Sequence, residues 1–160
     1  MTKSRKPLII IGAVVGLCAI GFVAARIMVV NASPTPGNLG VSNGKLAPCP
    51  STPNCVSSQA DNPDKLIAPI AFTTSAEEAR AKLLNVLESM SRLDIVDNQP
   101  TYIRAETQSP MIGFIDDNEF YIDEEAGVIH IRAAARLGQS DLNKNRERMD
   151  SIRAAFNSGQ

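Results

Sequence analysis

Five polar residues near the C-terminus have the types and the spacing of an anion-binding site. Arg132 and Arg136 are four residues apart in a predicted strand, so both side chains lie on one face of it. Asp141 stands where a predicted helix begins, and Asn145 and Arg146 follow within its first turns. Two guanidinium groups beside a helix N-terminus can hold a carboxylate or phosphate group. The alternative is that Asp141 caps the helix and binds one arginine, which would only order the turn.

Acidic residues gather in the segment before these arginines. Asp116, Asp117 and Glu119 are its first members, and residues 105–131 contain no Lys or Arg. The acids could pair with arginines inside the domain, because a hairpin brings Asp117 or Glu119 opposite Arg132. They could instead form an acidic docking surface for a partner. A Ca²⁺ or Mg²⁺ site is the third possibility, but the spacing of an EF-hand is missing, and we expect no metal site.

His130 is the only histidine, and no catalytic motif accompanies it. Strand alternation places its side chain with Val128 and Arg132. A general base needs a positioned nucleophile or water, and the sequence has no P-loop, no G-x-S-x-G and no Rossmann fingerprint. We therefore predict no catalytic residue and no cofactor. An enzyme that uses His130, or Asp116 and Asp117, remains a third functional possibility.

Two cysteines, Cys49 and Cys55, flank a proline-rich loop. In an oxidising compartment they can pair, and closing this short loop would stabilise the fold by roughly 2–2.5 kcal/mol in the chain-entropy model. Free thiols and a metal or redox site are the alternatives. Two thiols with one distant histidine make a poor zinc site, and a redox role would favour C-x-x-C spacing.

Residues 1–30 have the features of a cytoplasmic N-terminus followed by a transmembrane anchor. Leu8–Ala25 carries no charge, and a helix over residues 8–30 would reach roughly 35 Å, enough to cross a hydrocarbon core of about 30 Å. A cleaved signal is the alternative, because Val30-Asn31-Ala32 resembles a cleavage site. Three basic residues precede the apolar stretch, so the positive-inside rule places the rest of the chain outside. Arg26 can extend its charged end to the outer interface.

After the apolar stretch, residues 31–45 read as a flexible linker rich in Pro, Gly, Ser and Asn, and residues 46–157 as one folded domain. Ser75 and Glu78 form a capping box that starts a helix with an apolar stripe. A short apolar run that contains Pro69 predicts an edge strand within 67–72. Alternating patterns predict further strands within 93–96, 101–107, from 112–114 onward, 119–123 and 128–134, and a last helix begins near Asp141. The expected class is α+β: an antiparallel sheet of about four strands with two helices packed on one face.

Three motifs together resemble the family known as domain of unknown function 1499, found in bacteria and plant plastids. They are Cys49-Pro-x-x-Pro53-Asn54-Cys55-Val56-Ser57-Ser58, Gly113-Phe114-x-Asp116-Asp117-x-Glu119, and Ile129-His130-x-Arg132-x-x-x-Arg136-x-Gly138-x-Ser140-Asp141 with Asn145-Arg146. The resemblance covers roughly residues 46–156 and implies a fold but no activity. The sequence departs from the family at Ala133 and Ala135, where serines are common, and at Asn143, where glycine is favoured.

Charge excludes one broad class of partner. Residues 31–160 carry 12 basic and 17 acidic residues, and the chain has no Trp, so we expect no nucleic-acid partner. The resulting prediction is a single-pass protein of a bacterial cytoplasmic membrane with its domain in the periplasm. Its leading function is that of a non-catalytic accessory or interaction module, with integral-membrane proteins as partners. The alternative is a binder of a lipid, quinone or other anionic amphiphile.

Overall fold

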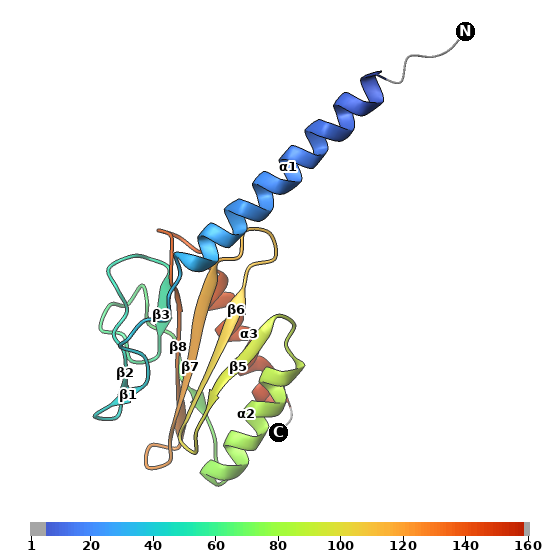
Figure 1. Cartoon of the computed structure of the whole chain (residues 1–160). Coiled ribbons are helices and arrows are strands. Elements are labelled where there is room, and N and C mark those ends of the chain that lie inside the picture. Colours follow the sequence, from blue (N-terminus) through green and yellow to red (C-terminus); the bar gives the residue numbers. More distant parts are fainter. Residues whose placement is uncertain (1–5, 159–160) are drawn as a thin grey trace.

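The N-terminal helix projects away from the rest of the molecule (Figure 1). The computed structural model describes residues 6–158, and side chains from residue 11 onward. Helix α1 (Lys6–Asn31) reaches a mean hydropathy of 2.4 over an 18-residue stretch within Ile11–Asn31, and none of that stretch is buried. It is long and apolar enough to cross a membrane, a property that anchors and signal sequences share.

A six-stranded antiparallel sheet forms the centre of the domain, in the order β3-β8-β7-β6-β5, with β4 also paired to β8. The expected α+β class is confirmed, because two helices cover one face of this sheet (Figure 1). The elements are β3 (Cys55–Ser57), β4 (Ile70–Ala71), α2 (Ala76–Ser89), β5 (Leu93–Asn98), β6 (Tyr102–Gln108), β7 (Ile115–Asp123), β8 (Val128–Ala135) and α3 (Lys144–Ser158).

The helix-covered face holds the apolar core. Helix α2 begins with the predicted capping box, in which Ser75 and Glu78 bind each other's backbone N–H groups, and it buries Leu83 and Leu87. Helix α3 buries Met149, Ile152 and Phe156. Against these side chains the sheet presents fully buried apolar residues from its central strands, including Ile103, Phe120, Ile129 and Ile131.

The sheet has more strands than the four that the sequence predicted. The four long strands, β5 to β8, match that prediction, and β4 lies in the expected edge strand. Strand β3 was missed because it has three residues, too few to show an alternating pattern, and it pairs with β8 about 75 residues later in the chain. A second sheet was also missed, the hairpin of β1 (Val41–Ser42) and β2 (Lys45–Leu46).

This hairpin lies in the segment expected to be a flexible linker. Its turn is Asn43-Gly44, and both residues have positive φ, at 51° and 71°, as a two-residue hairpin turn requires. Residues 32–50, called the covering segment below, run over the face of the sheet that lacks helices. The backbone of Ser33 and that of Gly40 hydrogen-bond to Arg136 and Glu119 on that face.

Candidate functional site

The face of the sheet beneath the covering segment carries a layer of charged side chains. Alternation along β7 places Asp117 and Glu119 on this face and Asp116 on the helix-covered face. Six residues, called the charged layer below, make up the ion pairs: Arg104, Glu106, Asp117, Glu119, Arg132 and Arg136. Three arginines face three carboxylates, so the layer is balanced in charge.

Glu119 and Arg132 form the innermost pair of this layer. The register of β7 and β8 sets them directly opposite each other, as the sequence had suggested, and Arg132 Nη1 lies 2.6 Å from Glu119 Oε2. The second carboxylate oxygen accepts hydrogen bonds from the Tyr102 hydroxyl at 2.9 Å and from the Gly40 amide at 2.8 Å. Burial, together with the charge of Glu119, raises the pKa of Tyr102. The Glu119 side chain is fully buried, and both of its carboxylate oxygens have partners within the chain.

Asp117 is the centre of the remaining pairs. It accepts two hydrogen bonds of 2.8 Å from Arg136, through Nε and Nη2, and one of 3.0 Å from Arg104. Glu106 also pairs with both arginines. The hydrogen bonds that Arg136 donates to Asp117 are the main cause that raises the pKa of Arg136. Arg136 completes its set of partners by donating to the Ser33 carbonyl at 3.1 Å.

The predicted arginine pair thus lines a cleft but already has internal partners. A cleft of about 380 Å³ separates the covering segment from β8, and Arg132, Arg136 and Asp117 lie on its wall. Within the described part of the chain, Arg132 Nε is the one buried guanidinium nitrogen without a hydrogen-bond partner. The two predicted docking acids on this face, Asp117 and Glu119, are buried at 1% and 0% exposure.

Asp116, the third acid of the predicted docking surface, lies on the opposite face. It binds Arg148 of α3 at 2.8 Å, and burial raises its pKa despite that pair. Arg148 also donates to the side-chain oxygens of Asn118 and Asn145. Sequence reasoning left Arg148 out of the candidate site, although its positive charge and its place in the predicted last helix were visible signals.

The other predicted anion-binding residues organise the start of α3. Asp141 accepts hydrogen bonds from the backbone amides of Asn145, at 2.7 Å, and Asn143, at 3.2 Å. Asn143 has a φ of 67°, a conformation consistent with the glycine that the family favours there. Arg146 donates to backbone carbonyls of the 64–66 loop. Asp141, Asn145 and Arg146 therefore do not share a surface with Arg132 and Arg136 of the charged layer.

His130 stands in a row with a serine and an aspartate. Its Nδ1 lies 3.3 Å from Ser58 Oγ, and its Nε2 lies 3.7 Å from Asp123 Oδ2. Ser58 Oγ also accepts the amide of Ile131 at 2.9 Å, where the partner of β8 changes from β3 to β4. Ser58 therefore has a structural role, because its hydroxyl accepts the Ile131 amide, a backbone donor of β8 that neither β3 nor β4 pairs with.

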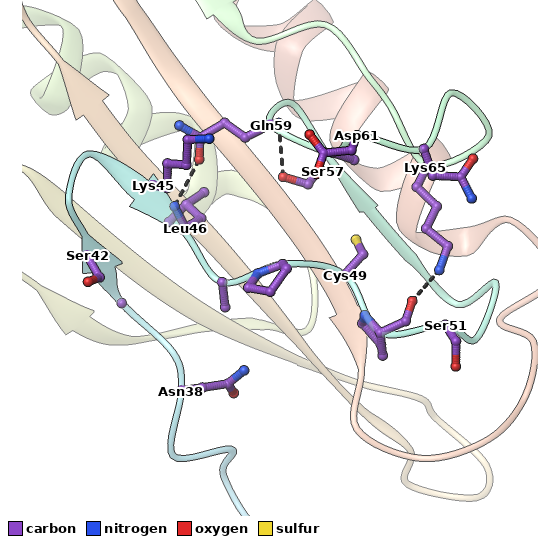
Figure 2. Close-up of a pocket in the computed structure, with 16 residues that line it drawn as sticks. Asn38, Ser42, Lys45, Leu46, Cys49, Ser51, Ser57, Gln59, Asp61 and Lys65 are labelled. Carbon is purple, nitrogen blue, oxygen red and sulfur yellow. Dashed lines mark hydrogen bonds between the residues drawn. The ribbon is translucent and has the colours of Figure 1, made fainter.

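A groove of about 590 Å³ separates the hairpin from the loop after β3 (Figure 2). Gln59 crosses it, accepting the Leu46 amide at 2.9 Å and donating to the Gly44 carbonyl at 2.9 Å. Lys65 reaches the Pro50 carbonyl from the other wall (Figure 2). Cys49 and Cys55 form the predicted disulfide, which ties the covering segment to β3. Among the residues that the structure describes, no cluster of three His, Cys, Asp or Glu side chains could hold a metal ion.

A further cavity, of about 510 Å³, lies between the β6–β7 loop and the start of α3. We call it the anchor-proximal cavity because the same loop contacts α1. Its walls combine apolar side chains, cations and two carboxylates, namely Pro110, Phe114, Leu137 and Leu142, then Arg92, Lys144 and Arg148, then Asp116, which pairs with Arg148, and Asp141.

The contact between α1 and the β6–β7 loop depends on Arg26. Its guanidinium donates to the carbonyls of Pro110 and Met111 at 3.1 Å each, to that of Ser109 at 3.4 Å, and to the Gln108 side chain at 3.1 Å. We call this set of bonds the Arg26 clamp. It joins the helix to a loop more than 80 residues away in the sequence.

The fold and these contacts define an α+β domain preceded by an apolar helix that can cross a membrane. The family model described as protein of unknown function (DUF1499) matches residues 45–156, most of the chain. The chain belongs to this family, and the resemblance of its three motifs is confirmed. No curated protein and no solved structure matches it.

Proposed function

We propose that this protein is a membrane-anchored module that acts by contact, as a non-catalytic accessory part of a membrane protein assembly. Helix α1 crosses a bacterial cytoplasmic membrane once, and the domain works on its outer side. The observation that carries this proposal is the Arg26 clamp, which fixes the domain to the end of its own anchor. A fixed orientation serves a protein that must present one surface to neighbours in the same membrane.

Two other features support this arrangement. The covering segment continues directly from α1, and the hydrogen bonds of Ser33 and Gly40 with the charged layer hold it to the domain. A chain that is hydrogen-bonded at both points gives the domain less freedom than a solvated tether would. The Cys49–Cys55 disulfide suits an oxidising compartment such as the periplasm.

Native mass spectrometry of the full-length protein, extracted gently from its own membranes, tests this proposal. We expect integral-membrane subunits to co-purify at a fixed stoichiometry. Arg26→Ala, which removes the clamp and leaves α1 apolar, should reduce that co-purification. Arg80→Ala is the matched control, because Arg80 is a half-buried arginine on α2 whose side chain, among the described residues, donates to Asn98 and Gln99 and not to the loop. A chain that never carries a protein partner contradicts the proposal.

The anchor-proximal cavity favours a second candidate, a binder of an anionic amphiphile. Apolar walls suit an acyl or isoprenoid chain, and the cations Arg92 and Lys144 suit a phosphate or carboxylate head group. This cavity replaces Arg132 and Arg136 as the preferred place for such a ligand, because carboxylates of the charged layer already balance the charges of those two arginines.

The same mass spectra test this candidate. A reproducible extra mass of lipid size on the chain would support it. The paired substitution of Arg92→Gln and Lys144→Gln should then reduce the bound fraction, whereas Arg80→Gln with Lys82→Gln on α2 should not. Retention of the ligand by the first pair would contradict a role for the cavity.

A further inference from the structure

The height of Arg26 along α1 fixes where the β6–β7 loop lies relative to a membrane. Arg26 follows 18 uncharged residues, Leu8 to Ala25, which span about 27 Å as a helix. A hydrocarbon core is about 30 Å thick, so an α1 that spans it brings Arg26 to the outer boundary. A guanidinium inside the hydrocarbon core would be energetically unfavourable. At the outer boundary, the carbonyls of the loop accept its hydrogen bonds.

The loop is held closely at that level. Residue Gly113 has a φ of 89°, and a Cβ at this position would lie 3.3 Å from the side chains of both Arg26 and Val30. Glycine therefore allows both the turn and the close approach to α1. Ser109 orders the loop from inside, because its hydroxyl accepts the amides of Gly113 at 3.1 Å and Phe114 at 2.9 Å. Figure 1 shows this loop beside the last turns of α1, near the end where the helix continues into the covering segment.

The outer side of the loop is apolar and exposed. Met111 is 68% exposed and Ile112 is 47% exposed, although a loop tip in water is usually polar. The segment 109–114 contains no acidic residue. Arg92, which is exposed, lines the anchor-proximal cavity together with the base of this loop. An apolar tip beside a cation matches the interface of an anionic lipid monolayer.

We propose that the β6–β7 loop is a second membrane contact, in which Met111 and Ile112 insert into the outer lipid monolayer around α1. This inference rests on the proposed function, because it requires α1 to span the membrane. The domain is then attached at two points, the helix and the loop, and the Arg26 clamp joins them. The loop keeps the domain from rotating away from the bilayer.

Tryptophan fluorescence can test this contact, because the chain contains no Trp. Met111→Trp and Ile112→Trp each place a probe on the loop at an exposed position where it should not disturb the core. Val96→Trp on β5 is the matched control, since Val96 is apolar and 46% exposed but lies away from the loop. Phe22→Trp reports on α1 itself.

Each full-length variant is reconstituted into vesicles of phosphatidylcholine and phosphatidylglycerol with bromine on the acyl chains. We expect both loop probes to emit at shorter wavelength than the Val96→Trp control and to lose intensity to bromine placed near the head groups. Val96→Trp should keep its intensity. Phe22→Trp, which lies about 6 Å inside the level of Arg26, should be quenched most by bromine on the acyl chains below the head groups.

The probe positions distinguish the loop contact from the proposed membrane anchoring of α1. Quenching of Phe22→Trp with both loop probes unquenched overturns the loop contact and leaves the anchored module standing. An unquenched Phe22→Trp overturns both, since α1 is then outside the bilayer. Quenching of either loop probe together with Phe22→Trp supports the contact.

Discussion

Glu119 and Phe120 are neighbours on β7, and both side chains are fully buried, but different parts of the chain bury them. Phe120 lies under α2 and α3, in a core of aliphatic and aromatic groups. Glu119 lies under the covering segment, which has few large apolar side chains and contributes a backbone amide to the carboxylate. The sheet is therefore closed by hydrophobic packing on one face and by matched hydrogen bonds on the other.

This difference separates stability from specificity. Apolar packing tolerates many exchanges of similar volume, whereas a buried charge tolerates no loss of its partner. The covering segment can donate to the Glu119 carboxylate of the Arg132–Glu119 pair only in the register that brings the Gly40 amide beside it. The charged face thus selects one path for the segment that leads from the anchor.

The largest losses of stability should come from substituting one fully buried side chain on each face of the sheet. Glu119→Gln leaves the buried Arg132 charge without a counter-ion, and Phe120→Ala leaves a cavity. Each should lower the free energy of unfolding by about 3–5 kcal/mol. Urea unfolding of the full-length protein in detergent micelles measures both losses.

A second substitution distinguishes the two faces. Adding Arg132→Met to Glu119→Gln removes the uncompensated charge while the glutamine oxygen still accepts from Tyr102 and Gly40. We expect this double variant to recover most of the lost stability. A double variant that is less stable than Glu119→Gln alone would mean that the pair itself, and not its balance, stabilises the fold.

A smaller effect should follow from removing the disulfide, which acts only on the charged face. Replacing Cys49 and Cys55 by alanine should reduce stability by roughly 2 kcal/mol, since the loop between them is short. The covering segment should also become easier to cleave by trypsin at Lys45, which is exposed. Equal cleavage rates in the variant and the parent protein would show that the hydrogen bonds alone hold the segment.

The smallest effect concerns pH. Burial lowers the pKa of His130 below its ordinary value of 6.5, and Asp123 offsets part of that shift. The unfolded chain then binds the proton more readily, so the contribution of the neutral imidazole is present above pH 6.5 and is lost as pH falls through 6.5 toward the lowered pKa. His130→Gln should flatten this part of the profile between about pH 8 and about pH 5. An unchanged profile in the variant would assign the pH dependence to other groups.

The helix-covered face was easier to predict from sequence than the charged face. Ser75 with Glu78 marks the start of α2, and the spacing of Leu83 and Leu87 marks its buried stripe, because both signals are local. Strand alternation also predicted that Glu119 could face Arg132. It equally placed Asp116 on the opposite face from Asp117, a consequence that grouping the acids by proximity in sequence overlooked.

The covering segment was the part that sequence reasoning missed. Asn43-Gly44 is a strong hairpin signal, but it stands in a stretch whose composition is typical of a linker. The covering segment is held to the sheet by hydrogen bonds of Ser33 with Arg136 and of Gly40 with Glu119. These partners lie 103 and 79 residues further along the chain. No local pattern encodes such pairings, so the candidate site was assembled from residues near one another in sequence instead.

The Arg26 clamp has a consequence for the order in which the molecule is made. Arg26 leaves the ribosome early, but the carbonyls that it binds belong to residues 82–85 positions later. Contacts of such long range form late in folding, after the loop-closure entropy has been overcome. In the proposed topology, in which α1 crosses the membrane, the helix enters the bilayer during synthesis before the partners of Arg26 have been made. In that topology the clamp closes only after the β6–β7 loop has also crossed, so its formation would mark completed export of the domain.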